Sequence, residues 1–154
     1  MKPAMIAAFL AVILAPVSAP AQTRTVNQAI DAVLGDHVAY ERVILATRKA
    51  VAAHDAAGVA ALVRYPITVT IGGKKRLVRT PAAFVARYDA IVTPAIAKAV
   101  TAGGYEDLMV NDQGVMLGQG EMWINGVCLD KACKRVDVKI ATIQPRSPLS
   151  PPLK

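Results

Sequence analysis

Histidine and cysteine are scarce in this 154-residue chain, which contains two of each. His37 and His54 lie far upstream of Cys128 and Cys133, so no set of nitrogen and sulfur ligands has the spacing of a zinc site. The sequence also lacks a G-x-S-x-G nucleophile motif and a glycine loop that would hold phosphate before a helix. We therefore expect no metal and no cofactor.

Aromatic residues are few, at 5% of the chain, and the lysines and arginines are dispersed. Neither a stacking platform nor a basic recognition motif is present, so we do not expect a nucleic-acid partner. The chain nevertheless has 18 Lys and Arg against 11 Asp and Glu. This excess favours a membrane surface, a cell-wall polymer or an acidic protein as partner, although exported proteins are often basic without such a role.

No apolar run reaches the roughly 20 helical residues that span a bilayer. Residues 5–14 form a shorter run, which follows Lys2 and precedes the A-x-A cleavage motif at 19–21. This arrangement predicts a signal peptide over residues 1–21, with an N-terminal core helix as the alternative. We expect a periplasmic or secreted protein in an oxidising compartment, with no stable membrane anchor.

The two cysteines, Cys128 and Cys133, are separated by four residues that include Asp130 and Lys131. A redox pair usually has two intervening residues. Four residues instead suit a hairpin turn whose ends bring two Cβ atoms within disulfide range. The spacing predicts a structural disulfide, and its short loop limits the expected stabilisation to about 2 kcal/mol.

The first part of the chain is predicted to be helical. Apolar residues recur at helical spacing over residues 25–63, with a break at Gly35, and Asp36 and Asp55 are suited to cap the second and third helices. Tyr65, which precedes a proline, ends this region. The apolar stripe of the second helix consists of Tyr40, Val43, Ile44, Thr47 and Val51. Glu41, Arg48 and Lys49 lie off this stripe, as on a solvated face.

Strand and helix signals then alternate. Residues 67–71 have strand periodicity, a Gly-Gly pair at 72–73 predicts a tight turn, and residues 74–79 form a charged returning edge. Thr80 and Thr93, each followed by proline, mark the starts of two further helices. The apolar face of the first of these consists of Phe84, Val85, Tyr88, Ile91 and Val92.

The last part of the chain is predicted to contain strands over residues 108–110, 115–124, 126–128 and 133–143. Residues 144–154 contain four prolines and are expected to form a disordered tail. The order of elements predicts one α+β domain over residues 22–143. Its helices are expected to pack on one face of a strongly curved, mainly antiparallel sheet.

A regular strand through residues 114–126 would place Met116, Met122 and Ile124 on one face. The opposite face would then carry Val115, Leu117, Gln119, Glu121 and Trp123. A bulge at one of the glycines would change this assignment.

Three segments resemble the NTF2-like (SnoaL-like) superfamily, in particular its small exported members. They are residues 54–69, beginning HDAAGVAALV and ending YPITV, residues 84–89, FVARYD, and residues 114–124, GVMLGQGEMWI. With the order of elements, the resemblance covers residues 36–143. It implies a cone in which a bent sheet wraps against helices and leaves a pocket at the open end. The superfamily includes isomerases, dehydratases and proteins without known activity, so it does not decide the function.

Five side chains are candidates for lining that pocket. Glu121 would supply a base and Trp123 an apolar wall, or alternatively Glu121 is exposed beside a core tryptophan. Tyr65, Tyr88 and Asp89 are the other candidates, although the tyrosines also suit packing and Asp89 a boundary position. No residue is assigned to catalysis. His54 is a candidate general base because histidine is the side chain whose ordinary pKa lies nearest neutrality, but its place after a long helix suits an interaction with the helix dipole.

These observations predict an exported, non-catalytic binding protein with a conical pocket for a small apolar ligand or a protein partner. The alternative is an isomerase- or dehydratase-like enzyme that uses a pocket carboxylate as general acid and base. The resemblance also implies a homodimer, with the charges of residues 135–139 at the rim of its interface. A further expectation is an anion-docking patch if the two basic hairpins lie on one side, with a solvated edge as the alternative. Its residues are Lys74, Lys75, Arg76, Arg79, Lys131, Lys134 and Arg135.

Overall fold

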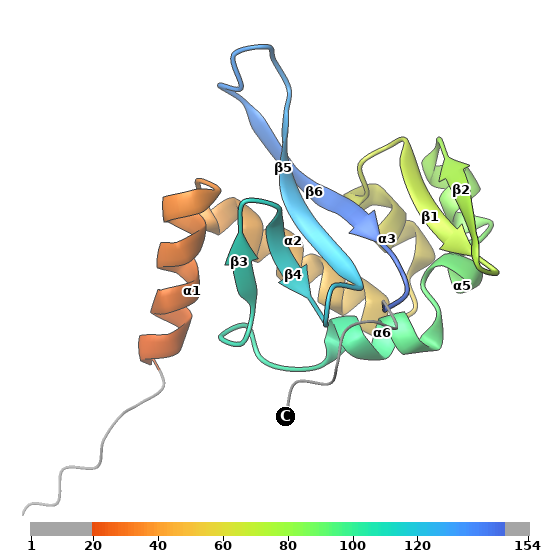
Figure 1. Ribbon diagram of the computed structural model, residues 1–154, viewed down its shortest axis with the longest axis horizontal. Helices are drawn as coiled ribbons and strands as arrows, with labels where there is room; N and C mark the ends of the chain where they lie inside the picture. The colour runs from red at the N-terminus through yellow and green to blue at the C-terminus, as the bar shows by residue number, and fades with distance from the viewer. Residues whose placement is uncertain (1–19, 147–154) are drawn as a thin grey trace, which may run out of the picture.

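The computed structural model describes residues 20–146. Within them the fold is α+β, with helices and two antiparallel sheets (Figure 1). The predicted signal peptide lies outside the described residues except for its last two, which begin the first helix. Residues 147–154 of the predicted tail also lie outside them.

Three helices come first, α1 (Pro20–Val33), α2 (His37–Ala52) and α3 (Ala56–Leu62). The predicted caps are confirmed, because the carboxylates of Asp36 and Asp55 accept hydrogen bonds from backbone N–H groups in the first turns of α2 and α3. The predicted stripe of α2 is also confirmed, since all five of its side chains are buried. Helix α2 therefore presents one continuous apolar face to the sheet.

The predicted hairpin follows as β1 (Ile67–Ile71) and β2 (Lys74–Val78), paired antiparallel. The helix expected next is broken into α4 (Pro81–Val85) and α5 (Tyr88–Ile91). The break occurs because the backbone of Arg87, with φ −126° and ψ 15°, leaves the helical region.

Helix α6 (Pro94–Thr101) leads into four strands, β3 (Met109–Asn111), β4 (Gly114–Leu117), β5 (Met122–Cys128) and β6 (Val136–Ile143). They form an antiparallel meander in chain order. The β1–β2 hairpin approaches β6, where Val63 forms a parallel bridge with Ile140 and the Arg64 N–H donates to the Ile140 carbonyl at 2.9 Å. The segment that leads into β1 is thus paired with β6, and β1 packs beside β6.

The expected strand over residues 115–124 is wrong, because the chain reverses between β4 and β5. Gly118 and Gly120 have φ values of +72° and +105°, which a side chain would disfavour, and they form the turn. Leu117 consequently pairs with Met122, so the two share a face rather than lying on opposite faces.

The other pairs of this hairpin follow the same correction. Val115 pairs with Ile124 on the buried face, and Met116 pairs with Trp123 on the outer face. The turn therefore decides which side chains of the 114–126 segment enter the core.

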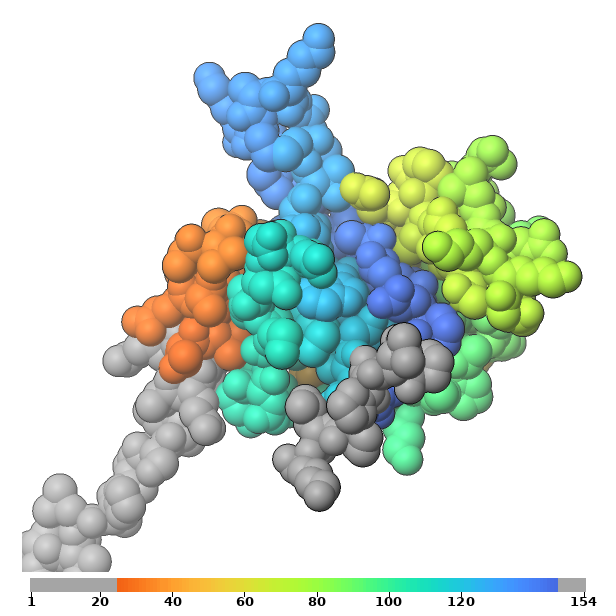
Figure 2. Space-filling model, viewed as in Figure 1, coloured from red at the N-terminus to blue at the C-terminus, as the bar shows by residue number. Residues whose placement is uncertain are grey.

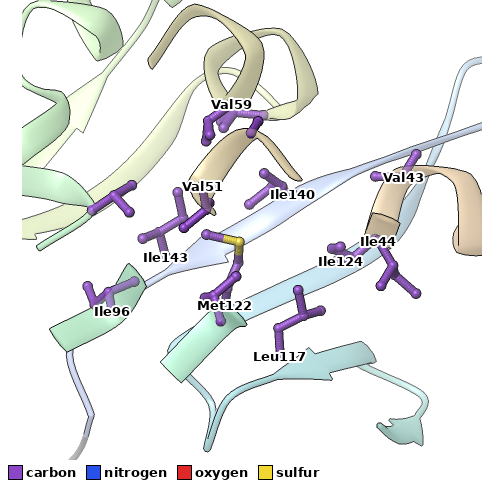
Figure 3. Close-up of a cluster of buried hydrophobic side chains, with 14 of the residues drawn as sticks. Val43, Ile44, Val51, Val59, Ile96, Leu117, Met122, Ile124, Ile140 and Ile143 are labelled. Carbon is purple, nitrogen blue, oxygen red and sulfur yellow. The ribbon is translucent and has the colours of Figure 1, made fainter. Parts of the chain in front are cut away.

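The space between α2 and the sheet is filled by aliphatic side chains (Figure 3). Ile44 of α2 lies near Ile124 of β5 in this cluster, and Ile140 of β6 is equally inaccessible to solvent. A fully buried side chain of this kind stabilises the fold by about 1.5–3 kcal/mol. The described cavities accordingly lie at the margins of the domain.

The predicted disulfide between Cys128 and Cys133 is present. It closes the end of the β5–β6 hairpin, where the two Cα atoms are 4.7 Å apart. This hairpin extends well beyond the helices and the rest of the sheet (Figure 1).

Candidate functional site

The candidate site is an open cleft of about 650 Å³ between the β1–β2 hairpin and the α4–α5 segment. Two guanidinium groups line it, from Arg76 on β2 and from Arg87 between α4 and α5. Its apolar lining includes Ile71 and Val85, the latter 41% exposed. We call it the arginine cleft. Two of the predicted pocket residues, Tyr88 and Asp89, also line it.

Tyr88 begins α5 and is 4% exposed. Its hydroxyl oxygen is buried and has no hydrogen-bond partner within the described part of the chain. Burial raises the pKa of this hydroxyl, and the nearby carboxylates of Asp89 and Asp55 raise it further. Tyr88 therefore keeps a protonated donor out of contact with solvent, and a buried donor without a partner is costly.

Asp89 lies at the margin of the cleft and contacts His54, an interaction that the sequence did not predict. The Nε2 atom of His54 is 3.0 Å from Oδ1 of Asp89. The His54 ring also packs edge-on against Tyr88, with centroids 5.1 Å apart. Both side chains are exposed, at 72% and 82% of their surfaces, so the contact adds little stability.

His54 reaches this position through an unusual backbone conformation. Its φ is +54°, in the left-handed region that residues with a side chain seldom occupy. The conformation lies between the end of α2 and the start of α3 and turns the ring toward α5. No local pattern predicts this contact, because His54 and Asp89 are far apart in the chain.

Tyr65, a third predicted pocket residue, lies behind the cleft. Its hydroxyl donates to the Ala60 carbonyl at 2.9 Å, and burial raises its pKa to about 12. Its ring packs edge-on against Phe84, which in turn contacts Tyr88. Tyr65 thus supports the cleft through an aromatic neighbour, and its hydroxyl is already occupied.

Glu121 and Trp123 lie elsewhere. Glu121 is in the β4–β5 turn, only 5% exposed, and its carboxylate accepts a hydrogen bond from the backbone N–H of Gln119. Trp123 is half-buried on the outer face of β5, opposite Met116. Neither lines the arginine cleft. The structure therefore brings together Tyr88 and Asp89 but separates them from the other pair of predicted residues.

A second cavity of about 290 Å³ lies between α2, the α6–β3 segment and the β4–β5 turn. Arg48, which the helical pattern placed on a solvated face, lines it and is half-buried. Its Nη2 atom donates to the carbonyls of Ala102 and Gly104 at 3.3 and 3.4 Å. Arg48 therefore holds the end of α6, a structural role that the helix dipole favours.

Within residues 20–146, no three His, Cys, Asp or Glu side chains come together to hold a metal ion. No helix in the same part of the chain has the length and apolarity needed to cross a membrane. Comparisons with protein-family models, with curated proteins and with solved structures found no match to this chain.

Proposed function

We propose that this chain is an exported, non-catalytic binding protein of the NTF2-like kind, and that the arginine cleft binds a small molecule with an apolar body and an acidic group. The observation that carries the proposal is the composition of the cleft. Arg76 and Arg87 provide donors, and Ile71 and Val85 provide an apolar surface.

The donors suit a carboxylate or a sulfonate. A guanidinium group presents a planar fork of N–H donors that matches two oxygens of such an anion. Asp89 would oppose an anion, but its carboxylate interacts with His54 at the margin. The two arginines are therefore the dominant charges available to a ligand.

The order of elements supports the NTF2-like part of the proposal. A helical region, a hairpin, further helices and a four-stranded meander follow one another, and the hairpin packs beside β6. The disulfide supports an oxidising compartment, as expected for an exported protein. The ligand class differs from the purely apolar one expected from the resemblance, because the core is filled and the cleft is basic.

Fluorescence titration with 1-anilinonaphthalene-8-sulfonate, an apolar anion, tests the proposal. The Arg76→Gln/Arg87→Gln double variant should bind the probe at least about 10-fold more weakly, since each lost charge-assisted contact is worth about 1.5 kcal/mol or more. Arg79→Gln/Lys98→Gln removes the same charge from outside the cleft and should bind as the unaltered protein does. Decanoate should displace the probe more effectively than decanol. Equal binding by the two double variants would contradict the proposal.

A second candidate function rests on the His54–Asp89 pair. A histidine oriented by a carboxylate at 3.0 Å is an arrangement used in general base catalysis, and Tyr88 lies against the same ring. Incubation of 4-oxodecanoate in D2O distinguishes the two functions by mass spectrometry. Protein-dependent deuterium uptake that is lost in His54→Gln would favour an enzyme, whereas a ligand recovered without accelerated exchange favours binding alone.

A further inference from the structure

The β5–β6 hairpin ends in an exposed basic and apolar surface that the arginine cleft does not explain. Figure 2 shows this end as a narrow arm above the body of the molecule. We call residues 128–136 the hairpin tip. Its side chains are exposed apart from that of Asp130, which is partly covered. The disulfide closes the tip and holds its two strands together.

The only carboxylate of the tip is used internally. Asp130 accepts hydrogen bonds from the backbone N–H groups of Ala132, Lys134 and Arg135 at 3.0–3.1 Å. The Leu129 N–H also donates to the Arg135 carbonyl at 2.8 Å. These bonds order the turn, and they engage the negative charge with backbone donors while the basic side chains remain exposed.

The outward side chains combine positive charge with apolar surface. Lys131, Lys134 and Arg135 are exposed, and Leu129 and Val136 are 54% and 47% exposed. Long basic side chains can lie along an apolar layer while their charged ends reach phosphate groups. Leucine flanked by such residues suits the boundary between lipid headgroups and acyl chains.

We propose that the hairpin tip docks this protein reversibly on an anionic lipid surface. Leu129 enters the headgroup region, and Lys131, Lys134 and Arg135 contact lipid phosphates. A stable protein interface needs about 800 Å² from each partner, which a narrow tip of this length supplies poorly. A fluid lipid surface can adapt to a projecting tip, so it satisfies both the charges and the leucine.

The tip acts independently of the arginine cleft. The sequence suggested a single patch if the two basic hairpins lay on one side, but Figure 1 places the β1–β2 turn and the hairpin tip at different ends of the molecule. Lys74 and Lys75, beside the β1–β2 turn, therefore provide a control of equal charge type at a distant site.

Co-sedimentation of the exported, disulfide-intact protein with vesicles tests the proposal. The vesicles contain either phosphatidylcholine alone or phosphatidylcholine with phosphatidylglycerol. Each basic side chain near an anionic surface strengthens binding about fivefold, so Lys131→Gln/Lys134→Gln/Arg135→Gln should weaken binding to the anionic vesicles by about 100-fold. Lys74→Gln/Lys75→Gln/Arg79→Gln should change binding much less. Leu129→Ser should weaken the binding that persists at high salt.

Three outcomes would overturn the proposal. They are equal binding to both kinds of vesicle, equal losses of binding in the two triple variants, and binding of the protein to polyglutamate, an acidic polymer, without binding to vesicles. Thermal unfolding of each variant establishes that it is folded. Because Arg135 is 3.7 Å from Asp130 in an ion pair, Lys131→Gln/Lys134→Gln is measured as well. This double variant keeps the ion pair and should still lose about 25-fold in binding.

Discussion

Replacement of Glu121 should destabilise the fold without affecting the arginine cleft. This carboxylate is buried in the β4–β5 turn and accepts the Gln119 N–H, although the sequence suggested a place for it in a pocket. A hydrogen bond to a charged acceptor contributes about 1.5–3 kcal/mol. Gln119 is exposed, so water can replace part of this bond. We therefore expect Glu121→Ala to lower the free energy of unfolding by about 2 kcal/mol.

Glu121→Gln keeps an acceptor oxygen and should cost about half as much, roughly 1 kcal/mol. Urea unfolding measures both changes. With a denaturant dependence of about 2 kcal/mol per molar, the midpoint should fall by about 1 M for the alanine variant. Asp112→Ala, an exposed carboxylate in the neighbouring β3–β4 turn, is the control and should change stability by less than about 0.5 kcal/mol.

Probe binding by the Glu121 variants tests whether this carboxylate has only a structural role. Both Glu121 variants should bind 1-anilinonaphthalene-8-sulfonate with the affinity of the unaltered protein, because Glu121 does not line the cleft. A Glu121→Ala variant with an unchanged urea midpoint and weakened probe binding would place the carboxylate in the ligand site after all.

Three further predictions concern stability. Cys128→Ser or Cys133→Ser should cost about 2 kcal/mol in urea unfolding and leave the far-ultraviolet circular dichroism spectrum unchanged, because the closed loop is short. Backbone N–H donors lower the pKa values of two carboxyl groups below the ordinary 3.8: the His37 N–H acts on Asp31, and the N–H groups of the hairpin tip act on Asp130. The two carboxylates therefore stabilise the fold fully above pH 3.8, and this stabilisation is lost as the pH falls through the lower pKa values of the folded state. Asp130→Asn should reduce the acid dependence of the urea midpoint. Burial raises the pKa of all four tyrosines, Tyr40, Tyr65, Tyr88 and Tyr105. The free energy of unfolding should therefore fall as the pH rises above 10, and absorbance should show that the tyrosines ionise only when the protein unfolds.

The features that the sequence predicted well depend on short-range geometry. Asp36 and Asp55 cap helices because a side-chain oxygen reaches N–H groups two or three residues further on. The buried stripe of α2 likewise depends on helical periodicity alone. The disulfide joins residues five positions apart, a separation that a hairpin turn accounts for locally.

The β4–β5 turn was missed because its residues have two interpretations. Glycine at positions 118 and 120 is compatible with a bent strand as well as with a turn. Only the pairing of β4 with β5 distinguishes the turn from the bent strand, and that pairing depends on which side chains the core accepts. The consequence was large, since reversal of the chain moved Val115 and Leu117 to the same face as Met122.

The site was predictable only in part. Tyr88 and Asp89 are adjacent in sequence and were identified together, but His54 meets them through the tertiary packing of α3 against α4. The environment of Arg48 was likewise not predictable from its own helix. Helical periodicity assigned it to solvent, whereas the end of α6 covers its guanidinium in the folded chain. Contacts between distant segments leave no periodic signal in either segment.

The position of the arginine cleft also bears on how freely its specificity can change. A ligand pocket inside the core would force its residues to serve packing and binding together, and polar groups there would destabilise the fold. Here aliphatic side chains fill the interior, whereas Arg76 and Arg87 are exposed at the margin. Substitutions at these two positions should therefore change ligand preference while the free energy of unfolding stays within about 0.5 kcal/mol. Binding and stability are separable in such an arrangement.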